Sequence, residues 1–305
     1  MRNTTVATAT IIIITIIIMV NLQRKRKMDY SLDSYAKINL FLDVLSKLPN
    51  GYHEILTLFS EVELHDKLKF FLTNKQEIKI VSNMESLNNS DNLIFKIAFY
   101  LQNRFSVKKG VIVELDKMIP VAAGLGGGSS NAATTLKALS VIWDLNLNDE
   151  TMHEIASQFG SDINYFLTGG TAIGRNRGEL LEKCNFIGID NILLVNPNIP
   201  ISSKTAYQAV TLKKENNNWI DLLKTSNPVY CYNKLEEGII PLYPIIQEIK
   251  NQMYSLNAVN TIMSGSGSTV IGFFDDPIKC KNAQAWFKNK GYWSYITTTR
   301  RRLEE

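Results

Sequence analysis

Apolar residues alternate with polar ones near the start of the chain. Ile38, Leu40, Leu42 and Val44 recur at every second position, which predicts a half-buried strand over 34–45. The sequence Pro49-Asn50-Gly51 then predicts a turn. Further strands are predicted over 56–64, 67–72 and 111–115.

Other segments place their apolar residues at helical spacing. Helices are predicted over 92–105, 131–143 and 150–159, the second capped by Ser129 or Ser130 and the third by Asn148 or Asp149. The second half predicts helices over 203–210, 243–254 and 278–290, strands over 192–195, 258–263 and 269–274, and a polar loop over 213–218. Strands and helices mix without regular alternation, which predicts an α+β fold rather than a doubly wound one.

The segment from Pro120 to Ala133 combines four glycines and two hydroxyls with the start of a predicted helix. Glycines let the backbone approach an anion, and the first N–H groups of a helix attract negative charge. A Walker loop would need Gly-Lys and a dinucleotide fingerprint would need Gly where Ser129 stands, counted from Gly124. The segment therefore predicts a phosphate-binding loop of neither kind, with a nucleotide as its ligand; a helix-capping loop that binds nothing is the alternative.

Composition and charge argue against a polymer-binding protein. The chain has 305 residues, of which 45% are hydrophobic and 20% charged, as in globular proteins, and its length suggests two domains. The net charge of +4 arises because five basic residues (Arg2, Arg24, Lys25, Arg26, Lys27) precede the first acidic residue, Asp29. From Met28 onward 28 basic residues face 29 acidic ones, so no nucleic-acid partner is expected.

The three cysteines, Cys184, Cys231 and Cys280, contain no Cys-x-x-Cys pair. Neither a disulfide framework nor a zinc site is indicated, which favours the reducing cytoplasm. The three histidines show no metal-ligand spacing.

An apolar run over 6–22, followed by four basic residues, precedes this body. It can be interpreted as a signal peptide, a membrane anchor or a translated upstream region. We favour the last, with Met28 as the working start, so residues 1–27 are expected to lie outside the fold and no stable membrane partner is expected.

Three segments in this order resemble the GHMP kinases, a superfamily of small-molecule kinases: Ala36-Lys37-Ile38-Asn39-Leu40, the glycine segment, and Ser264-Gly265-Ser266-Gly267-Ser268. The sequences Asn50-Gly51-Tyr52-His53-Glu54 and Gly160-Ser161-Asp162 narrow the resemblance to members that act on 4-diphosphocytidyl-2-C-methyl-D-erythritol. The resemblance implies a two-domain α+β fold with the active site in the cleft between the domains. The N-terminal domain would cover 28–175 and the C-terminal domain 176–305.

The implied reaction is ATP-dependent phosphorylation of the substrate's 2-hydroxyl in the non-mevalonate route to isoprenoid precursors. By resemblance, Asp162 is the base that accepts the hydroxyl proton, and Lys37 beside it keeps that carboxylate charged and stabilises the moving phosphoryl group. The ATP phosphates would lie on Pro120, Val121, Ala122, Ala123, Gly124, Leu125, Gly126, Gly127, Gly128, Ser129 and Ser130. Ser129 or Ser130 is expected to reach Mg²⁺, whose other ligands the sequence leaves unknown.

The resemblance also implies a substrate that carries a cytidine diphosphate group. Tyr52 would stack on the base, His53 would bond its edge, and Tyr207 would cover its opposite face. Asn39 would bind the polyol or phosphate, and the turn over 265–268 would close the site. The protein would act as a monomer or homodimer.

The sequence departs from the family pattern after Asp162. Ile163-Asn164 stands where the family has Val-Pro or Ile-Pro, so a less rigid turn is expected there.

Three rival functions are weighed against this one. Another GHMP kinase is the nearest rival, and Asn50-Gly51-Tyr52-His53 argues against it. A silent nucleotide-binding regulator is disfavoured by the presence of Lys37 and Asp162 together. A membrane-tethered interaction protein is supported only by the apolar run over 6–22.

Overall fold

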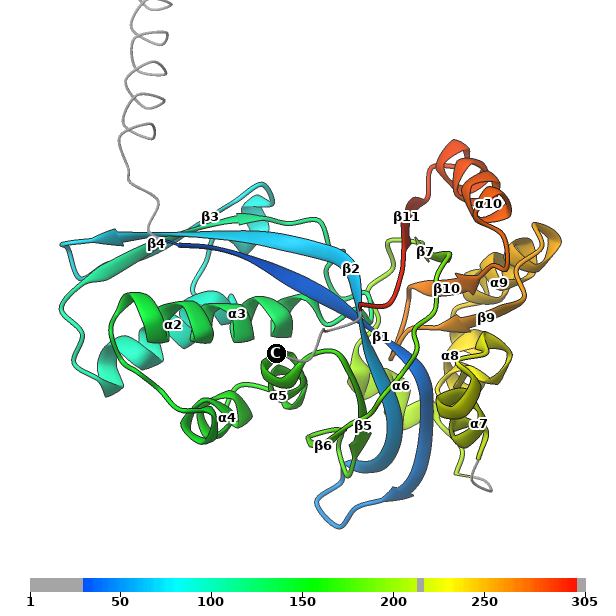
Figure 1. The fold of residues 1–305 in the computed structure, drawn as a ribbon, viewed down its shortest axis with the longest axis horizontal. Helices are drawn as coiled ribbons and strands as arrows, with labels where there is room; N and C mark the ends of the chain where they lie inside the picture. Colours follow the sequence, from blue (N-terminus) through cyan, green and yellow to red (C-terminus); the bar gives the residue numbers. More distant parts are fainter. Residues whose placement is uncertain (1–29, 213–216, 301–305) are drawn as a thin grey trace, which may run out of the picture.

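The computed structural model describes residues 30–212 and 217–300, and within them the chain forms a seven-stranded sheet and a four-stranded sheet. Helices lie against both sheets, without regular alternation with the strands (Figure 1). The α+β prediction is confirmed. The predicted extension over 1–27 lies outside the described residues.

The larger sheet is built around a long antiparallel pair, β1 (Tyr30–Lys47) and β2 (His53–Thr73). Its order is β3-β4-β2-β1-β8, and β5 pairs with both β2 and β6. The remaining strands are β3 (Ile78–Ser82), β4 (Gly110–Asp116), β5 (Thr171–Arg175), β6 (Leu180–Lys183) and β8 (Tyr232–Asn233). Helices α2 (Leu93–Arg104), α3 (Gly127–Ile142), α4 (Asp149–Ser157) and α5 (Ser161–Thr168) lie on one side of this sheet (Figure 1).

The smaller sheet has the antiparallel order β11-β7-β10-β9. Its strands are β7 (Ile192–Asn196), β9 (Asn260–Met263), β10 (Val270–Phe273) and β11 (Trp293–Thr297). The helices of this half are α6 (Ser203–Ala209), α7 (Asn218–Thr225), α8 (Glu236–Leu242), α9 (Ile245–Ser255) and α10 (Pro277–Asn289), and the chain also has short 3-10 turns at Glu85–Leu87 and Pro228–Tyr230.

Strand β1 joins the two halves. Ala36, Ile38 and Leu40 pack in one buried cluster with Leu194 of β7 and Phe273 of β10. Other clusters fill the space between the larger sheet and α2, α3 and α5, and between the smaller sheet and α8, α9 and α10. The larger sheet also contains β6 and β8, which follow residue 176, and the domain boundary predicted there stays a prediction.

Three predicted elements differ from the structure. The predicted strands 56–64 and 67–72 form one strand, β2, because Asp66 between them is a buried and fully bonded residue rather than a turn residue. Strand β1 is buried on both faces around Lys37 and Asn39, where a half-buried strand is predicted. The predicted loop 213–218 lies partly outside the described residues, and α7 begins at Asn218.

Helix α3 begins at Gly127, four residues before the predicted start. Its N-cap is Gly126, which has φ 68° and no capping side chain, so the prediction of Ser129 or Ser130 as the cap is wrong. Both serines lie inside the first turn, because the glycines preceding them can adopt the helical and left-handed conformations that start the helix early. Asn148 caps α4 through its side chain, as predicted.

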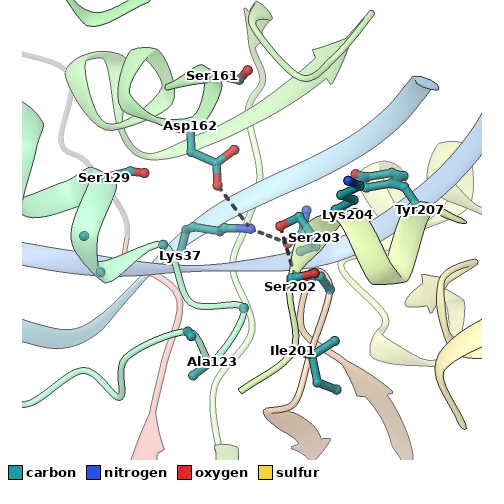
Figure 2. A pocket seen from close by; sticks show the side chains of 18 of the residues that line it. Lys37, Ala123, Ser129, Ser161, Asp162, Ile201, Ser202, Ser203, Lys204 and Tyr207 are labelled. Carbon is teal, nitrogen blue, oxygen red and sulfur yellow. Dashed lines mark hydrogen bonds and ion pairs between the residues drawn. The ribbon is translucent and has the colours of Figure 1, made fainter. Parts of the chain in front are cut away.

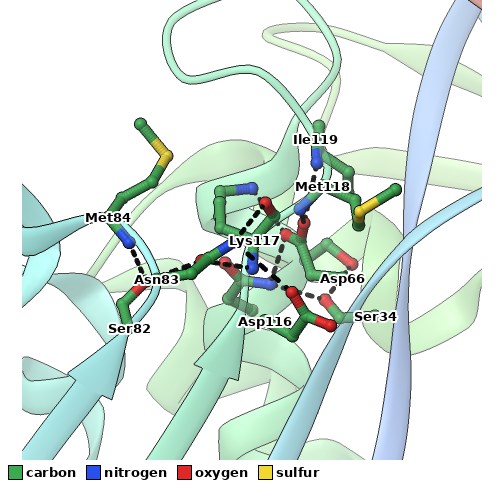
Figure 3. A network of polar contacts seen from close by, with 11 residues as sticks. Ser34, Asp66, Ser82, Asn83, Met84, Asp116, Lys117, Met118 and Ile119 are labelled. Atoms are coloured by element: carbon green, nitrogen blue, oxygen red, sulfur yellow. Dashed lines mark hydrogen bonds and ion pairs between the residues drawn. The ribbon is translucent and has the colours of Figure 1, made fainter.

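The carboxylate of Asp66 connects β2 to the glycine segment (Figure 3). It accepts hydrogen bonds from Lys117 Nζ at 2.5 Å, from the N–H groups of Met118 and Ile119 at 2.8 Å each, and from Asn131 Nδ2 at 2.9 Å. Burial lowers the pKa of Lys117 while Asp66 opposes that shift. Since Met118 and Ile119 precede Pro120 and Asn131 lies in α3, this one side chain positions both ends of the glycine segment.

None of the helices within residues 30–212 and 217–300 is both long and apolar enough to cross a membrane.

Replacing Asp66 by Asn should destabilise the protein by about 3–5 kcal/mol, the usual result of breaking a buried ion pair from one side. The midpoint of urea unfolding measures the loss. The matched control is Asp33→Asn, because Asp33 is a partly exposed carboxylate on β1 that lies 4.0 Å from Lys67, and it should change stability by less than about 1 kcal/mol. Equal effects of the two variants would show that Asp66 does not anchor the segment.

Candidate active site

A cleft of about 940 Å³ brings together segments that are far apart in the sequence. Its walls come from β1, the glycine segment, the start of α5, the start of α6 and the turn after β9. All the predicted site residues line it except Leu125 and Ser130. Leu125 is buried, and Ser130 Oγ accepts a hydrogen bond from Ser34 Oγ at 2.7 Å, so both serve the packing of the segment.

Lys37 lies at the base of this cleft on β1 (Figure 2). Its Nζ donates to Asn39 Oδ1 at 2.7 Å and lies 3.9 Å from Asp162 Oδ2. Burial lowers the pKa of Lys37 below its ordinary value of 10.5, and the nearby Asp162 carboxylate partly opposes this shift. Two opposing effects thus act on the Lys37 amine: burial disfavours its charged form, and the Asp162 carboxylate favours it.

Asn39 holds Lys37 in place. Lys37 and Asn39 are two positions apart on β1 and so share a face of the strand. Asn39 also donates from Nδ2 to Thr57 Oγ1 at 2.8 Å, and Thr57 donates to the Phe41 carbonyl at 2.8 Å. The predicted substrate-binding role of Asn39 stays a prediction, and its visible contacts fix the Lys37 ammonium.

Asp162 lies in the first turn of α5, where the positive end of the helix dipole favours a carboxylate. Its side chain is 41% exposed and points toward Lys37 (Figure 2). Two residues later, Asn164 shares a 3.0 Å hydrogen bond with His153 Nδ1 and donates to Ser157 Oγ at 2.8 Å. These bonds tie α5 to α4 at the position where the family has a proline, and the less rigid turn predicted there stays a prediction.

The glycine segment is held against both halves of the molecule. Gly124 has φ 77°, and a Cβ there would lie 2.0 Å from the Ser264 carbonyl oxygen, so only glycine permits this approach to the turn after β9. Ser264 Oγ donates to the Gly124 carbonyl at 3.0 Å, and the Lys37 N–H donates to the Leu125 carbonyl at 3.0 Å. The segment is therefore docked on β1 and on the Ser264 turn at once.

The start of α3 faces the cleft. Gly127, Gly128 and Ser129 line it, and α3 has no capping side chain to occupy its first N–H groups. A Cβ at Gly128 would meet nothing within 4 Å, so there is open space at this end. The Lys117 ammonium lies beside the first residue of α3, since a Cβ added at Gly127 would lie 2.8 Å from Lys117 Nζ. This arrangement can hold an anion.

The other end of the cleft is aromatic. His53 and Tyr207 stack on each other with ring centroids 5.6 Å apart and planes 19° apart. A base between two rings needs about 7 Å, since each stacked pair lies about 3.5 Å apart, so in this structure no base fits between these two. One imidazole face is covered by Tyr207, which leaves the edge of His53 for hydrogen bonding. Burial and, to a lesser extent, Lys47 lower the pKa of His53.

The charges of the cleft favour anionic ligands. Lys37, Lys117, Arg177 and Lys204 line it, against the single carboxylate of Asp162. Among residues 30–212 and 217–300, no group of three or more His, Cys, Asp or Glu side chains could hold a metal ion. Phosphate groups therefore fit this cleft better than a metal held by protein ligands alone.

The predictions from sequence missed Lys117 and Arg177, which both line the cleft. Lys117 lies two residues after the predicted strand 111–115 and three residues before Pro120, so its position next to the glycine segment is visible in the sequence. Arg177 lies in the sequence Arg175-Asn176-Arg177-Gly178, whose asparagine and glycine indicate a tight turn. No local signal shows that this turn reaches the cleft.

Comparison with known proteins identifies the family. The family model for the GHMP kinase N-terminal domain matches residues 92–170, and the model for the GHMP kinase C-terminal domain matches residues 209–292.

Full-length relatives narrow the assignment. The 4-diphosphocytidyl-2-C-methyl-D-erythritol kinase of Thermodesulfovibrio yellowstonii is 38% identical over 87% of this chain and 96% of its own length. That of Caldanaerobacter subterraneus is 36% identical over 90% and 97%. A crystal structure of 4-(cytidine 5'-diphospho)-2C-methyl-D-erythritol kinase superimposes with a TM-score of 0.78 at 27% identity, covering 89% of this chain and all of the other. The chain belongs to the GHMP kinases and, within them, to the 4-diphosphocytidyl-2-C-methyl-D-erythritol kinase family.

Proposed function

We propose that this protein transfers the γ-phosphoryl group of ATP to the 2-hydroxyl of 4-diphosphocytidyl-2-C-methyl-D-erythritol, giving the 2-phosphate and ADP. The observation that carries the proposal is the position of the Lys37–Asp162 pair, at 3.9 Å, in a cleft with an anion-binding helix start and an aromatic end. The family membership supports the same reaction, with ATP as the phosphate donor.

Asp162 is the base in this proposal. Its carboxylate accepts the proton of the substrate hydroxyl while the hydroxyl oxygen forms a bond to the γ-phosphorus and the bond to the leaving ADP oxygen breaks. Asp162 is accessible from the cleft, as a group that contacts substrate must be. In this proposal the Lys37 ammonium, next to that carboxylate, stabilises the negative charge on the transferring phosphoryl group.

The glycine segment holds the ATP phosphates. Of the predicted residues, Pro120 to Gly124 and Gly126 to Ser129 line the cleft and would contribute through their backbone. The first N–H groups of α3, which no side chain caps, would act as donors, and Lys117 adds a cation beside Gly127. Leu125 and Ser130 contribute by fixing the segment rather than by contact. The positive end of α3 then substitutes for the lysine that a Walker loop would have.

Mg²⁺ would arrive with ATP. The cleft residues fit this, because one carboxylate and the hydroxyl of Ser129 leave most coordination positions to phosphate oxygens and water. When bound, the metal neutralises phosphate charge. The protein's own part is to hold the phosphates on α3 and to keep the Lys37 ammonium near the phosphoryl group.

The aromatic end holds the cytidine group. Tyr52 is 54% exposed and its ring offers a stacking surface, and the free edge of His53 can bond the base. Tyr207 supports His53 here, and a role as the second stacking face would require its ring to separate from the imidazole. These aromatic residues favour a nucleotide-linked substrate over homoserine or mevalonate.

We further propose that the enzyme acts in the cytoplasm as a monomer or homodimer. Cys184, Cys231 and Cys280 are free thiols in the fold, and burial raises the pKa of each. Thiols of this kind fit a reducing compartment.

A substrate panel tests the proposed reaction. ADP release from ATP should occur with 4-diphosphocytidyl-2-C-methyl-D-erythritol and stay at the background rate with homoserine and with mevalonate. Phosphorus NMR of the product should show a new phosphomonoester on the diphosphocytidyl compound. Turnover with homoserine or mevalonate alone would contradict the proposed substrate.

Asp162→Asn should lower kcat by about two to four orders of magnitude, the usual range for loss of a general base, and leave ATP affinity nearly unchanged. Single-turnover kinetics and equilibrium ATP binding measure the two effects. Asp149→Asn, in the exposed first turn of α4, is the matched control and should behave like the wild type. Undiminished turnover in the Asp162 variant would remove this carboxylate from the mechanism.

The pH profile of kcat should reveal the buried ammonium of Lys37. Because burial lowers the pKa of Lys37 from 10.5, its charge is lost as the pH rises at a lower pH than for an exposed lysine. The alkaline fall in kcat should therefore begin below that value. In Lys37→Arg, whose guanidinium stays charged, the residual activity should show no such fall; an unchanged alkaline limb would assign it to another group.

A further inference from the structure

The turn between β5 and β6 carries a side chain into the cleft that the proposed mechanism does not use. Its backbone is fixed on several sides. The Gly178 N–H donates to the Arg175 carbonyl at 2.9 Å, and the Ile55 N–H donates to the Asn176 carbonyl at 2.6 Å. The Glu179 carboxylate accepts from the Arg177 N–H at 2.8 Å and from Asn176 Nδ2 at 2.7 Å. The Arg177 side chain thus extends from a well-anchored turn.

The guanidinium of Arg177 has two partners from different elements. Its central carbon lies 4.0 Å from the centroid of the Tyr52 ring, and Nη2 donates to Ser161 Oγ at 2.9 Å. Ser161 immediately precedes Asp162 in the first turn of α5 (Figure 2). Arg177 therefore connects the exposed aromatic ring to the helix that carries the proposed base.

Tyr52 needs such a partner to keep one orientation. Tyr52 follows Gly51, which has φ 84°, in the short connection between β1 and β2, and the residue is 54% exposed. An exposed ring on a loop has several accessible rotamers, and a guanidinium over one face selects among them. With one face against Arg177, the other face is the one that a planar ligand can use.

The desolvation of Arg177 supports a specific role. Its Nε is buried and has no hydrogen-bond partner among the described residues. A buried donor without a partner is unfavourable. The contact with the Tyr52 ring and the hydrogen bond to Ser161 therefore have to offset this cost to keep the guanidinium in its position. Neighbouring Arg175 differs, since its guanidinium lies 5.8 Å from the Trp219 ring, and Arg175 does not line the cleft.

We propose that Arg177 is a positioning residue that determines specificity: it holds the Tyr52 ring as a platform on which the planar base of a nucleoside diphosphate stacks. This inference rests on the proposed function and goes beyond it. It states that the orientation of the Tyr52 ring depends on the Arg177 guanidinium, which contacts the face of the ring opposite to the base.

The test compares Arg177→Met with the wild type. Calorimetric Kd for cytidine 5′-diphosphate and KM for the diphosphocytidyl substrate should each rise by about threefold to thirtyfold, the range that a cation–π contact allows. The KM for ATP should stay within about twofold, which a general loss of structure would not permit. Arg177→Lys, which keeps a cation, should recover part of the affinity, and Arg175→Met is the control that should match the wild type.

A double-mutant cycle separates positioning from direct contact with the ligand. If Arg177 acts through the ring, Arg177→Met should add no further loss of cytidine diphosphate affinity in the Tyr52→Ala background. Additive losses would overturn the inference, since they would show that the guanidinium binds the ligand independently of Tyr52. Unchanged affinity in both Arg177→Met and Arg177→Lys would overturn it as well.

Wild-type measurements distinguish this inference from the proposed function. A wild-type protein that neither binds cytidine diphosphate nor phosphorylates the substrate would overturn the proposed function, and the inference with it. A wild-type protein that does both, with an Arg177→Met variant that is equally effective, would overturn only the role of Arg177.

Discussion

The buried carboxylate of Asp66 is the contact on which the rest of the site depends. It lies on β2 and accepts hydrogen bonds from the Lys117 ammonium, from two backbone N–H groups just before the glycine segment and from the Asn131 side chain of α3. A charged group in the interior is stable only when it is paired and hydrogen-bonded. Because its partners lie at the two ends of the glycine segment, satisfying this charge also fixes the segment that leads into α3.

A second constraint comes from the close approach of separate loops. Gly124 lies against the Ser264 carbonyl, and the Lys37 N–H bonds the Leu125 carbonyl. The glycine segment is thereby held between the larger sheet and the β9–β10 turn of the smaller sheet. Its glycines serve this packing as much as they serve an incoming phosphate, and both uses follow from the missing side chain.

The cleft joins two kinds of surface. One has the glycines at the start of α3 and the ammonium groups of Lys37 and Lys117, whereas the other has the rings of Tyr52, His53 and Tyr207. The Lys37–Asp162 pair, at 3.9 Å, lines the same cleft, and in the proposed function it acts on the phosphoryl group. Burial lowers the pKa of Lys37, and the nearby Asp162 carboxylate partly opposes this shift.

The amino-acid sequence by itself was sufficient for the α+β class and the position of most helices and strands, because these depend on residue spacing within one segment, which is visible without a fold. The sequence also pointed to Lys37 and Asp162 through the family resemblance and to the glycine segment through its composition. The structure brings these residues into one cleft, and their roles stay predictions. Only the tertiary structure showed the contacts between distant segments and their effects: β2 continues through the buried Asp66, α3 starts at Gly127, and the Arg177 guanidinium contacts the Tyr52 ring. Each of these depends on a partner far away in the chain, and local patterns carry no information about such partners.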